Sequence, residues 1–238
     1  MLTFISEHWS AFARGAVITL QYTAISCLLG AILAIPIALM RLSEKRALFW
    51  PATVYVLFFR GTPLLAQIFL IYYGSGQFRP ALEAVGLWQF FREPWFCAIL
   101  TLSLNTAAYS SEIFRGALQA IPRGEIEAAM ALGLSPLLRL RFILIPRALA
   151  AAWPAYTNEI VYQVQATSLV SIITVMDITG VARVIASRNF DFYQAFLTAA
   201  AFYLVIVYLI IALAKRVEAR LHAHLPAADR GVGRNVRV

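Results

Sequence analysis

Polar side chains recur at helical spacing inside a segment of the chain that is otherwise apolar. Asn105, Tyr109 and Glu112 stand at i, i+4 and i+7, which places them on one face of a helix. A polar face inside a bilayer must turn toward protein or water, so these groups could line a path for a polar solute. Glu112 also has a structural alternative, because it could pair with Arg115 three residues along. Asn105 and Tyr109 lie deeper in the segment and are the better candidates for contact with a solute.

A second apolar segment is the most polar of all. Glu159, Gln163 and Thr167 fall at i, i+4 and i+8, and Asn158 lies on the neighbouring face. Recognition of a zwitterion needs such groups: an acceptor for its ammonium group, and amides or a cation for its carboxylate. Ionisable groups at membrane depth are costly and therefore mark functional sites. Glu159 could hold an ammonium or guanidinium group of a solute, or else neutralise Arg60.

A third apolar segment is interrupted by the run Arg-Gly-Thr-Pro at residues 60–63. Pro63 removes a backbone donor and Gly61 weakens the helix, so we expect a kink or an unwound turn here. Freed carbonyl groups, Arg60 and Thr62 could then face a polar cavity. Alternatively, Arg60 extends to the membrane surface or pairs structurally with a carboxylate.

Covalent chemistry is not indicated by any part of the sequence. It contains no Gly-x4-Gly-Lys-Ser/Thr loop for ATP, no cluster with metal-ligand spacing, and no nucleophile with a positioned base. Cys27 and Cys97 fall in apolar segments without metal or disulfide spacing, which is typical of packing residues. We therefore expect a protein that is not an enzyme and that holds no cofactor or metal of its own.

The composition is that of a polytopic membrane protein. Apolar residues make up 61% of the chain and charged residues 13%, against about 45–50% and about 25% in soluble domains. We predict an all-α protein with a single transmembrane domain over residues 1–225 and a disordered cytoplasmic tail over 226–238. A helical span needs about 20 apolar residues. Five spans are expected on this basis: 15–40, 48–73, 95–120, 148–176 and 195–214.

Lysine and arginine gather on one side of these spans. The loop at 41–46, the segment 122–147 and the tail after residue 214 carry them in excess over the loops of the other side. Because positively charged loops stay in the cytoplasm, the N-terminus is predicted to lie outside and the C-terminus inside. The same rule explains most of the net charge of +8, so no nucleic-acid partner is expected.

The segment 122–147 is more structured than a plain loop between spans. Residues 125–132 are strong helix formers, and Gly133 stands where a glycine commonly ends a helix. Ser135 and Pro136 are then the expected N-cap and first residue of a second helix, which runs to about Leu144, where Pro146 interrupts it. An ordered helix pair at a membrane face suggests a docking surface for another protein.

This segment also resembles the EAA motif of ABC-importer permease subunits. The matching residues are Glu127-Ala128-Ala129, Gly133 and Ile143-x-Ile145-Pro146, with Ile145 where the family favours leucine. The rest of the chain is similar to the polar amino acid branch, and nearest to histidine, lysine/arginine/ornithine and opine permeases. The blocks that carry this similarity are 59–64, 104–109, 112–113, 115–116, 158–159 and 167–169.

The resemblance implies a type I ABC-importer permease fold in a bacterial inner membrane, with segment 122–147 as the cytoplasmic coupling loop. It implies docking of a separate ATPase, which binds ATP and magnesium, and an external solute-binding protein. It also implies contact with membrane lipid and a second permease chain, with a heterodimer favoured over a homodimer. The implied solute is a basic or other polar amino acid, or an opine. The coupling residues would be Glu127, Ala128, Ala129, Gly133, Ile143 and Pro146.

The solute path is expected along the polar faces described above. An alternative function is a gradient-driven secondary transporter that uses Glu112 and Glu159 as ion or proton sites. The candidate path residues are Arg60, Thr62, Asn105, Tyr109, Glu112, Asn158, Glu159 and Gln163.

Overall fold

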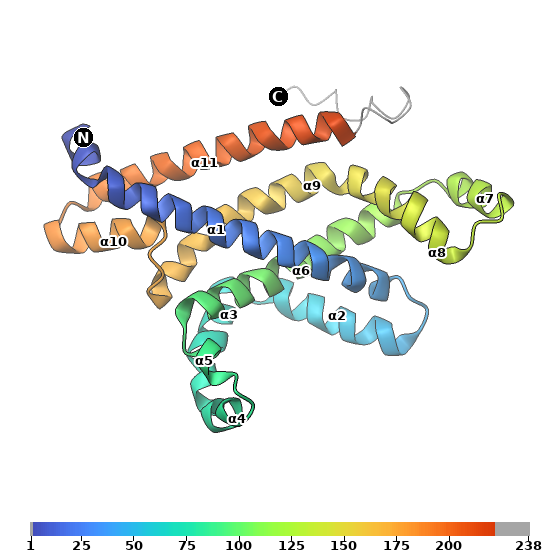
Figure 1. Cartoon of the computed structure of the whole chain (residues 1–238), viewed down its shortest axis with the longest axis horizontal. Helices are drawn as coiled ribbons and strands as arrows, with labels where there is room; N and C mark the ends of the chain where they lie inside the picture. The colour runs from blue at the N-terminus through green and yellow to red at the C-terminus, as the bar shows by residue number, and fades with distance from the viewer. Residues whose placement is uncertain (1, 222–238) are drawn as a thin grey trace.

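The computed structural model describes residues 2–221, and this part of the chain is helical with no strand (Figure 1). The first half comprises α1 (Leu2–Arg41), α2 (Arg46–Gly61), α3 (Leu64–Tyr72), the 3-10 helix η1 (Gly74–Phe78), α4 (Arg79–Ala84), α5 (Trp88–Phe91) and α6 (Pro94–Gln119). The second half comprises α7 (Arg123–Ala131), α8 (Pro136–Arg139), the π-helical turn η2 (Leu140–Leu144), α9 (Ile145–Ala166), the 3-10 helix η3 (Thr167–Ile173), α10 (Ile178–Asn189) and α11 (Phe192–Leu221). The tail at 226–238, for which disorder is expected, lies outside the described residues.

Helix α6 forms the centre of the molecule. It packs most extensively against α1, and α9, α3 and α2 also lie against it. Small residues line much of this contact, including Ala107 and Ala108, both with no exposed surface. Small side chains let helix backbones approach closely, which is how helices associate inside a bilayer. Helices α1 and α6 approach closely at Gly30 of α1, where an added Cβ would lie 2.3 Å from the Thr106 side chain.

Two helices of the described chain, α1 and α11, are long and apolar enough to cross a membrane alone. Two bent pairs raise the number to four: α2 with α3 and α4, bent by 107°, and the helix running from α8 to η3 with α10, bent by 46°. The predicted all-helical membrane fold is confirmed, and the five expected spans agree roughly with this number. The remaining expected span, 95–120, coincides with α6, which is not among these candidates, although its 26 residues reach about 39 Å at about 1.5 Å per residue. Neighbouring helices cover α6, so it can be more polar than a helix that faces lipid.

The break expected at residues 60–63 is present. Helix α2 ends at Gly61, and Pro63 has the extended φ of −62° and ψ of 134° immediately before α3 begins. Because proline cannot donate a backbone hydrogen bond and disfavours helix at the residue before it, the chain turns sharply here.

The expected interruption at Pro146 is wrong. Helix α8, the π turn η2 and α9 follow one another without a gap, and Pro146 lies in the first turn of α9. Within η2 the Ile145 N–H bonds to the Leu140 carbonyl, five residues back, which widens the helix by one residue. The run is continuous here, so the missing donor of Pro146 is accommodated by the wider π turn that directly precedes it.

Helix α10 closes the end of the bundle that is remote from α7 and α8 (Figure 1). Asp177 caps it, since its Oδ1 accepts a 2.8 Å hydrogen bond from the Gly180 N–H and its Oδ2 accepts one of 2.8 Å from the Tyr203 hydroxyl. Ile178 and Ala182 pack with Phe12 in an apolar core shared by α1, α10 and α11. The cap and this core fix α10 against the two long helices.

Candidate coupling loop and solute path

Helix α7 lies at one end of the molecule and stops in a defined way (Figure 1). Gly133 has a φ of +73°, a conformation that glycine adopts without strain. The Gly133 N–H bonds to the Met130 carbonyl at 2.9 Å, and the Leu134 N–H to the Ala129 carbonyl at 3.1 Å. These two bonds form a Schellman motif, so the role expected for Gly133 as the end of a helix is confirmed.

Helix α8 begins as the sequence predicted. Ser135 is its N-cap, and its Oγ accepts a hydrogen bond of 3.4 Å from the Leu138 N–H. Pro136 occupies the first helical position. The turn between α7 and α8 is therefore fixed at both sides.

The residues of the EAA motif face in different directions. Glu127 and Ala128 are exposed, whereas Ala129 is 2% exposed and packs inward. Ile143 is half-buried and Pro146 is exposed. Large apolar side chains nearby are also open to the surroundings, namely Met130, Leu132, Leu137 and Phe142. An exposed apolar surface on an ordered helix pair is typical of a protein docking site.

An ion pair connects α7 to the start of α9. The Arg147 Nε donates to Glu125 Oε2 at 3.1 Å, and a second Arg147 nitrogen donates to Glu125 Oε1. A two-point arginine–carboxylate contact restricts orientation as well as distance. Helix α7 is thus attached directly to the helix that carries Glu159.

Asn105 is buried at the break between α2 and α3. Its Nδ2 donates to Gln67 Oε1 at 3.0 Å and to the Phe59 carbonyl at 3.2 Å. Gln67 in turn donates to the Phe59 carbonyl at 2.8 Å and to Thr62 Oγ1 at 2.9 Å. These amides satisfy backbone groups that the break releases. Gln67 was not singled out from the sequence, although it is the one amide in the apolar run 64–72.

Glu159 and Gln163 are also buried, and both connect α9 to other helices. Glu159 is 7% exposed and its Oε1 accepts a 2.7 Å hydrogen bond from the Thr106 hydroxyl. Gln163 is fully buried and donates to Ser26 Oγ at 2.9 Å and to the Leu102 carbonyl at 3.3 Å. The two side chains therefore bridge α9 to α6 and α1.

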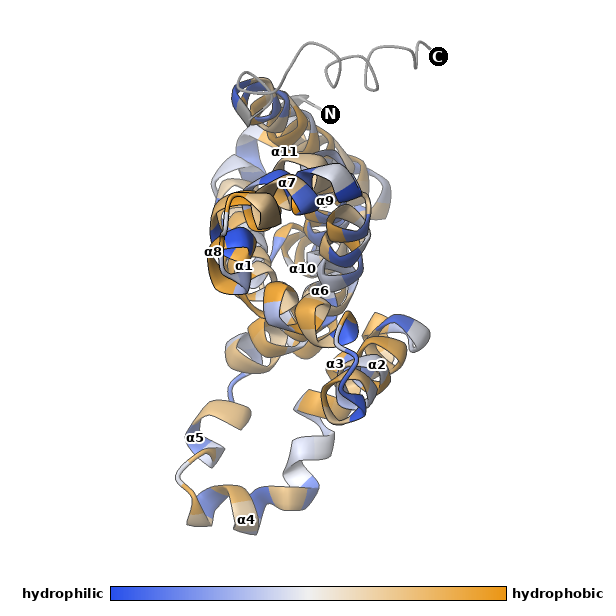
Figure 2. Cartoon of the chain, turned by 90° about the vertical axis from the view of Figure 1, so that its right-hand side faces the viewer, coloured by the Kyte–Doolittle hydropathy of each residue, from blue (hydrophilic) through white to orange (hydrophobic). Residues whose placement is uncertain are grey.

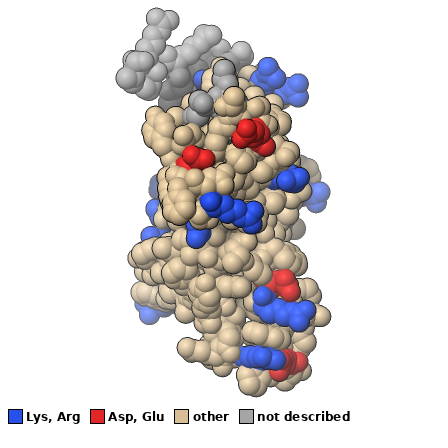
Figure 3. Space-filling model, turned by 90° about the vertical axis from the view of Figure 1, so that its left-hand side faces the viewer, with Lys and Arg blue, Asp and Glu red and all other residues tan. Residues whose placement is uncertain are grey.

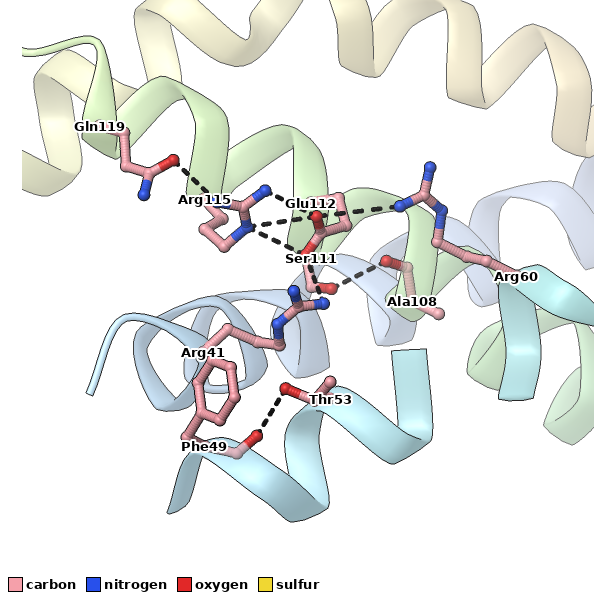
Figure 4. A network of polar contacts seen from close by, with 9 residues as sticks. All are labelled: Arg41, Phe49, Thr53, Arg60, Ala108, Ser111, Glu112, Arg115 and Gln119. Atoms are coloured by element: carbon pink, nitrogen blue, oxygen red, sulfur yellow. Dashed lines mark hydrogen bonds and ion pairs between the residues drawn. The ribbon is translucent and has the colours of Figure 1, made fainter. Parts of the chain in front are cut away.

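Glu112 is surrounded by three guanidinium groups (Figure 4). Its carboxylate lies 2.8 Å from Arg115, 3.0 Å from Arg41 and 3.8 Å from Arg60. The i, i+3 pair with Arg115 is therefore present, and Arg60 pairs with Glu112. Arg60 also lies over the Tyr109 ring, with its Cζ 5.2 Å from the ring centroid. Three positive charges against one negative charge leave this cluster with an excess of positive charge.

An open polar face remains between α6 and α9. The Arg60 side chain is 44% exposed and Tyr162 is 46% exposed, and the Tyr109 and Tyr162 rings lie 6.1 Å apart. Asn158 is exposed one helical turn from Tyr162 on the same side of α9. The structure thus brings Arg60, Tyr109 and Glu112 together on this face, while the other predicted path residues divide between it and the buried contacts.

The apolar helices, the open polar face and the exposed helix pair α7–α8 are the features of an integral membrane component of a transport system. The model of the family described as "Binding-protein-dependent transport system inner membrane component" matches residues 26–223, and the chain belongs to this family. It is a multi-pass protein of the inner membrane, a permease subunit that performs no catalysis itself. The alternative of a secondary transporter finds no support.

Similar proteins of known name are permease proteins. The nopaline transport system permease protein NocM of Agrobacterium fabrum is 46% identical over 226 residues, with 95% of this chain and 94% of that protein covered. The arginine ABC transporter permease protein ArtM of Haemophilus influenzae is 39% identical, with 91% and 95% covered. HisM of Salmonella typhimurium, a histidine/lysine/arginine/ornithine permease, is 37% identical, with 94% and 99% covered.

Solved structures give the same fold. A chain of an amino acid ABC transporter crystallised with histidines superposes with a TM-score of 0.80 at 29% identity, covering 92% of this chain and 98% of that one. A chain of the inward-facing methionine transporter MetNI superposes with a TM-score of 0.75 at 21% identity, covering 90% and 98%.

Proposed function

We propose that this chain is the permease subunit of an ATP-driven importer for polar, most simply basic, amino acids or opines. The names of the similar permeases support this class of solute. The observation that carries the coupling part of the proposal is the exposed end of α7 and α8, fixed by Gly133 and Ser135 and attached to α9 through Glu125 and Arg147.

In this proposal α7 and α8 lie in the cytoplasm and receive a separate ATPase that binds ATP and magnesium. Exposed Glu127 and Ala128 belong to the docking surface, and inward-packed Ala129 anchors it. The N-terminus lies outside and the C-terminus inside, which agrees with the distribution of basic residues. An external solute-binding protein delivers the solute at the opposite end.

The solute path follows the open face formed by Arg60, Tyr109, Tyr162 and Asn158, with Glu112 and Glu159 as the adjacent carboxylates. Polar groups of a membrane span do not face lipid, so protein must shield this face from lipid and enclose the water-filled path. A second permease subunit fits that requirement, and a related sister chain is favoured over an identical copy. Buried Asn105 and Gln163, with half-buried Thr62, hold the helices that shape the path.

The coupling proposal is tested by Gly133→Asp and Glu127→Lys. Gly133→Asp strains the positive φ and changes the exit from α7, while an added Cβ would meet nothing within 4 Å. Gly124→Asp is the matched control, because Gly124 lies in the first turn of α7, has similar open space and suits an acidic residue. We expect both test variants to insert normally and lose ATP-driven uptake while the control keeps it. Normal uptake in both test variants would show that this surface does not couple.

The path proposal is tested by Glu159→Gln. Glutamine keeps an oxygen that can accept the Thr106 hydrogen bond and removes the charge. We expect weaker uptake or altered solute preference with the ATPase still bound, measured by pull-down from the membrane. Thr106→Ser keeps both the hydroxyl and the charge and serves as the control. Unchanged uptake and unchanged preference in Glu159→Gln would remove Glu159 from the path.

A further inference from the structure

Residues 74–93, comprising η1, α4 and α5, form an arm that projects sideways from the helical bundle (Figure 1, Figure 2). Ser75 is the one side chain of this arm that is buried, and α4 and α5 have none. Phe78 is 65% exposed and Val85 is 67% exposed, and Leu87 and Phe90 are exposed as well. In Figure 2 the arm shows apolar and polar residues in alternation, at a distance from the apolar interior of the bundle.

The contacts within the arm are too few to order it in water. Arg79 Nε lies 2.8 Å from Glu83 Oε1, and the Arg79 Cζ lies 5.3 Å from the centroid of the Trp88 ring. Exposed pairs of this kind contribute about 0–1 kcal/mol each, whereas fixing one residue of backbone costs about 1–2 kcal/mol. Helices of four and six residues are also too short to be stable alone. The surroundings of the arm must therefore supply most of its order.

The level of the arm along the bundle is set by α2 and α6. The 16 residues of α2 rise about 24 Å at about 1.5 Å per residue, against a hydrocarbon layer of about 30 Å. The chain then turns by 107° and runs across the bundle through α3 and α4. Helix α6 begins at Pro94, directly after the arm. The arm is thus about one membrane thickness from the start of α2, toward the end of the bundle remote from α7, and it runs across the bundle axis.

The composition of the arm matches this level. Trp88, with Trp95 just beyond the arm, is an amphipathic side chain of the kind enriched where hydrocarbon meets headgroups, and Phe90 and Phe91 are apolar side chains typical of the buried face of interfacial helices. The charges are balanced in neighbouring pairs, Arg79 with Glu83 and Arg92 with Glu93. In Figure 3 blue and red atoms likewise lie side by side at the lower end, where the arm projects. A balanced set of charges suits a headgroup layer of mixed dipoles better than a partner surface of one sign.

We propose that the arm lies in the lipid headgroup layer, on the membrane face remote from α7, with its exposed apolar side chains inserted toward the acyl chains. The lipid-facing surface of the spans then continues onto the arm, and the bilayer covers what the chain leaves open. The arm fixes the depth and rotation of α3 and α6, between which it is the connection. This proposal depends on insertion into the membrane and is independent of which solute is carried.

The test is nitroxide labelling of the assembled transporter in lipid nanodiscs. Val85→Cys places the label on the arm, and Ala81→Cys is a second arm position if the first variant is poorly made. Cys27 and Cys97 are buried, 7% and 0% exposed, so they do not compete for label in the folded protein. Collision with oxygen reports lipid, and collision with a water-soluble nickel chelate reports solvent.

Two exposed positions calibrate the measurement. Glu44→Cys, at an exposed residue of the charged loop between α1 and α2, reports water, and Leu204→Cys, at a 71% exposed residue of α11, reports the membrane interior. We expect the oxygen-to-nickel ratio of the arm labels to lie between the two and several-fold above that of Glu44→Cys. A ratio equal to that of Glu44→Cys would place the arm in water and overturn the proposal. Low access to both reagents would mean that protein covers the arm, and would overturn it equally.

Discussion

Replacing Gly30 by alanine tests a close contact between α1 and α6 and, through it, the position of Glu159. An added Cβ would lie 2.3 Å from Thr106 Cγ2 and 3.2 Å from the Ala107 nitrogen. Thr106 is fully buried and its hydroxyl donates to Glu159 Oε1 at 2.7 Å. The new methyl group therefore fits only if α1 and α6 separate or if Thr106 rotates away from Glu159.

Either response has a cost that can be estimated. Forcing a methyl group into a packed core costs about 1–3 kcal/mol, and losing a hydrogen bond to a buried charged group costs about 1–3 kcal/mol. Alanine in place of glycine within a helix stabilises the folded protein by about 0.5–1 kcal/mol, which offsets part of this cost. The expected net loss is about 1–2 kcal/mol, and at about 2–4 °C per kcal/mol the apparent Tm falls by about 2–8 °C.

The assay uses the two buried thiols, Cys27 and Cys97, which react with a fluorogenic maleimide only when the protein unfolds. Gly116→Ala is the matched control, since an added Cβ in α6 there meets nothing within 4 Å, and its Tm is expected to stay equal or rise. Thr106→Ser removes the clashing methyl group and keeps the hydroxyl, so it should restore Gly30→Ala. A wild-type Tm in Gly30→Ala, or no recovery in the double variant, would refute the reasoning.

Two further changes give distinct outcomes in the same thermal assay. Tyr55→Phe removes the 2.6 Å hydrogen bond from the Tyr55 hydroxyl to the Leu104 carbonyl and should lower the free energy of unfolding by about 1 kcal/mol. Tyr208→Phe, at an exposed tyrosine, is the control and should leave the Tm unchanged. Equal Tm values for the two variants would show that the hydrogen bond has no effect on stability. Gly180→Ala places a Cβ 2.5 Å from the Val175 carbonyl oxygen, a backbone atom that cannot rotate away. The Tm of this variant should therefore fall further than that of Gly30→Ala. A smaller fall would contradict the close packing of Gly180 against Val175.

Local backbone chemistry in the loop between α6 and α9 was predictable from the sequence. Gly133 and Ser135-Pro136 act through bonds to residues three to five positions away, so a short window of sequence contains all the information they need. Pro146 was predicted wrongly by the same kind of reasoning. Its effect depends on whether the preceding turn can widen, and the π turn at residues 140–144 does so.

The polar faces show where the sequence is insufficient. Helical spacing placed Asn105 and Gln163 on faces of their helices, and gave no means to tell a face toward water from one toward another helix. Asn105 bonds to Gln67, 38 residues away, and Gln163 bonds to Ser26, 137 residues away. These partners stand in other spans, and only the packing of the bundle brings them within hydrogen-bonding distance.

The connection between α7 and α9 gives the proposed function a physical route. Helices α8, η2 and α9 form one uninterrupted helical run, and the Glu125–Arg147 pair attaches α7 to its side. A helix transmits displacement along its axis because its backbone bonds resist stretching, so movement of a docked ATPase would reach α9 directly. Asn158, Glu159 and Tyr162 all project from α9. Under the proposed function, the surface that the ATPase moves and the groups that meet the solute therefore belong to one continuous helical run, in which the π turn and Pro154 are the places where the run can bend as α9 tilts against α6 to open the path.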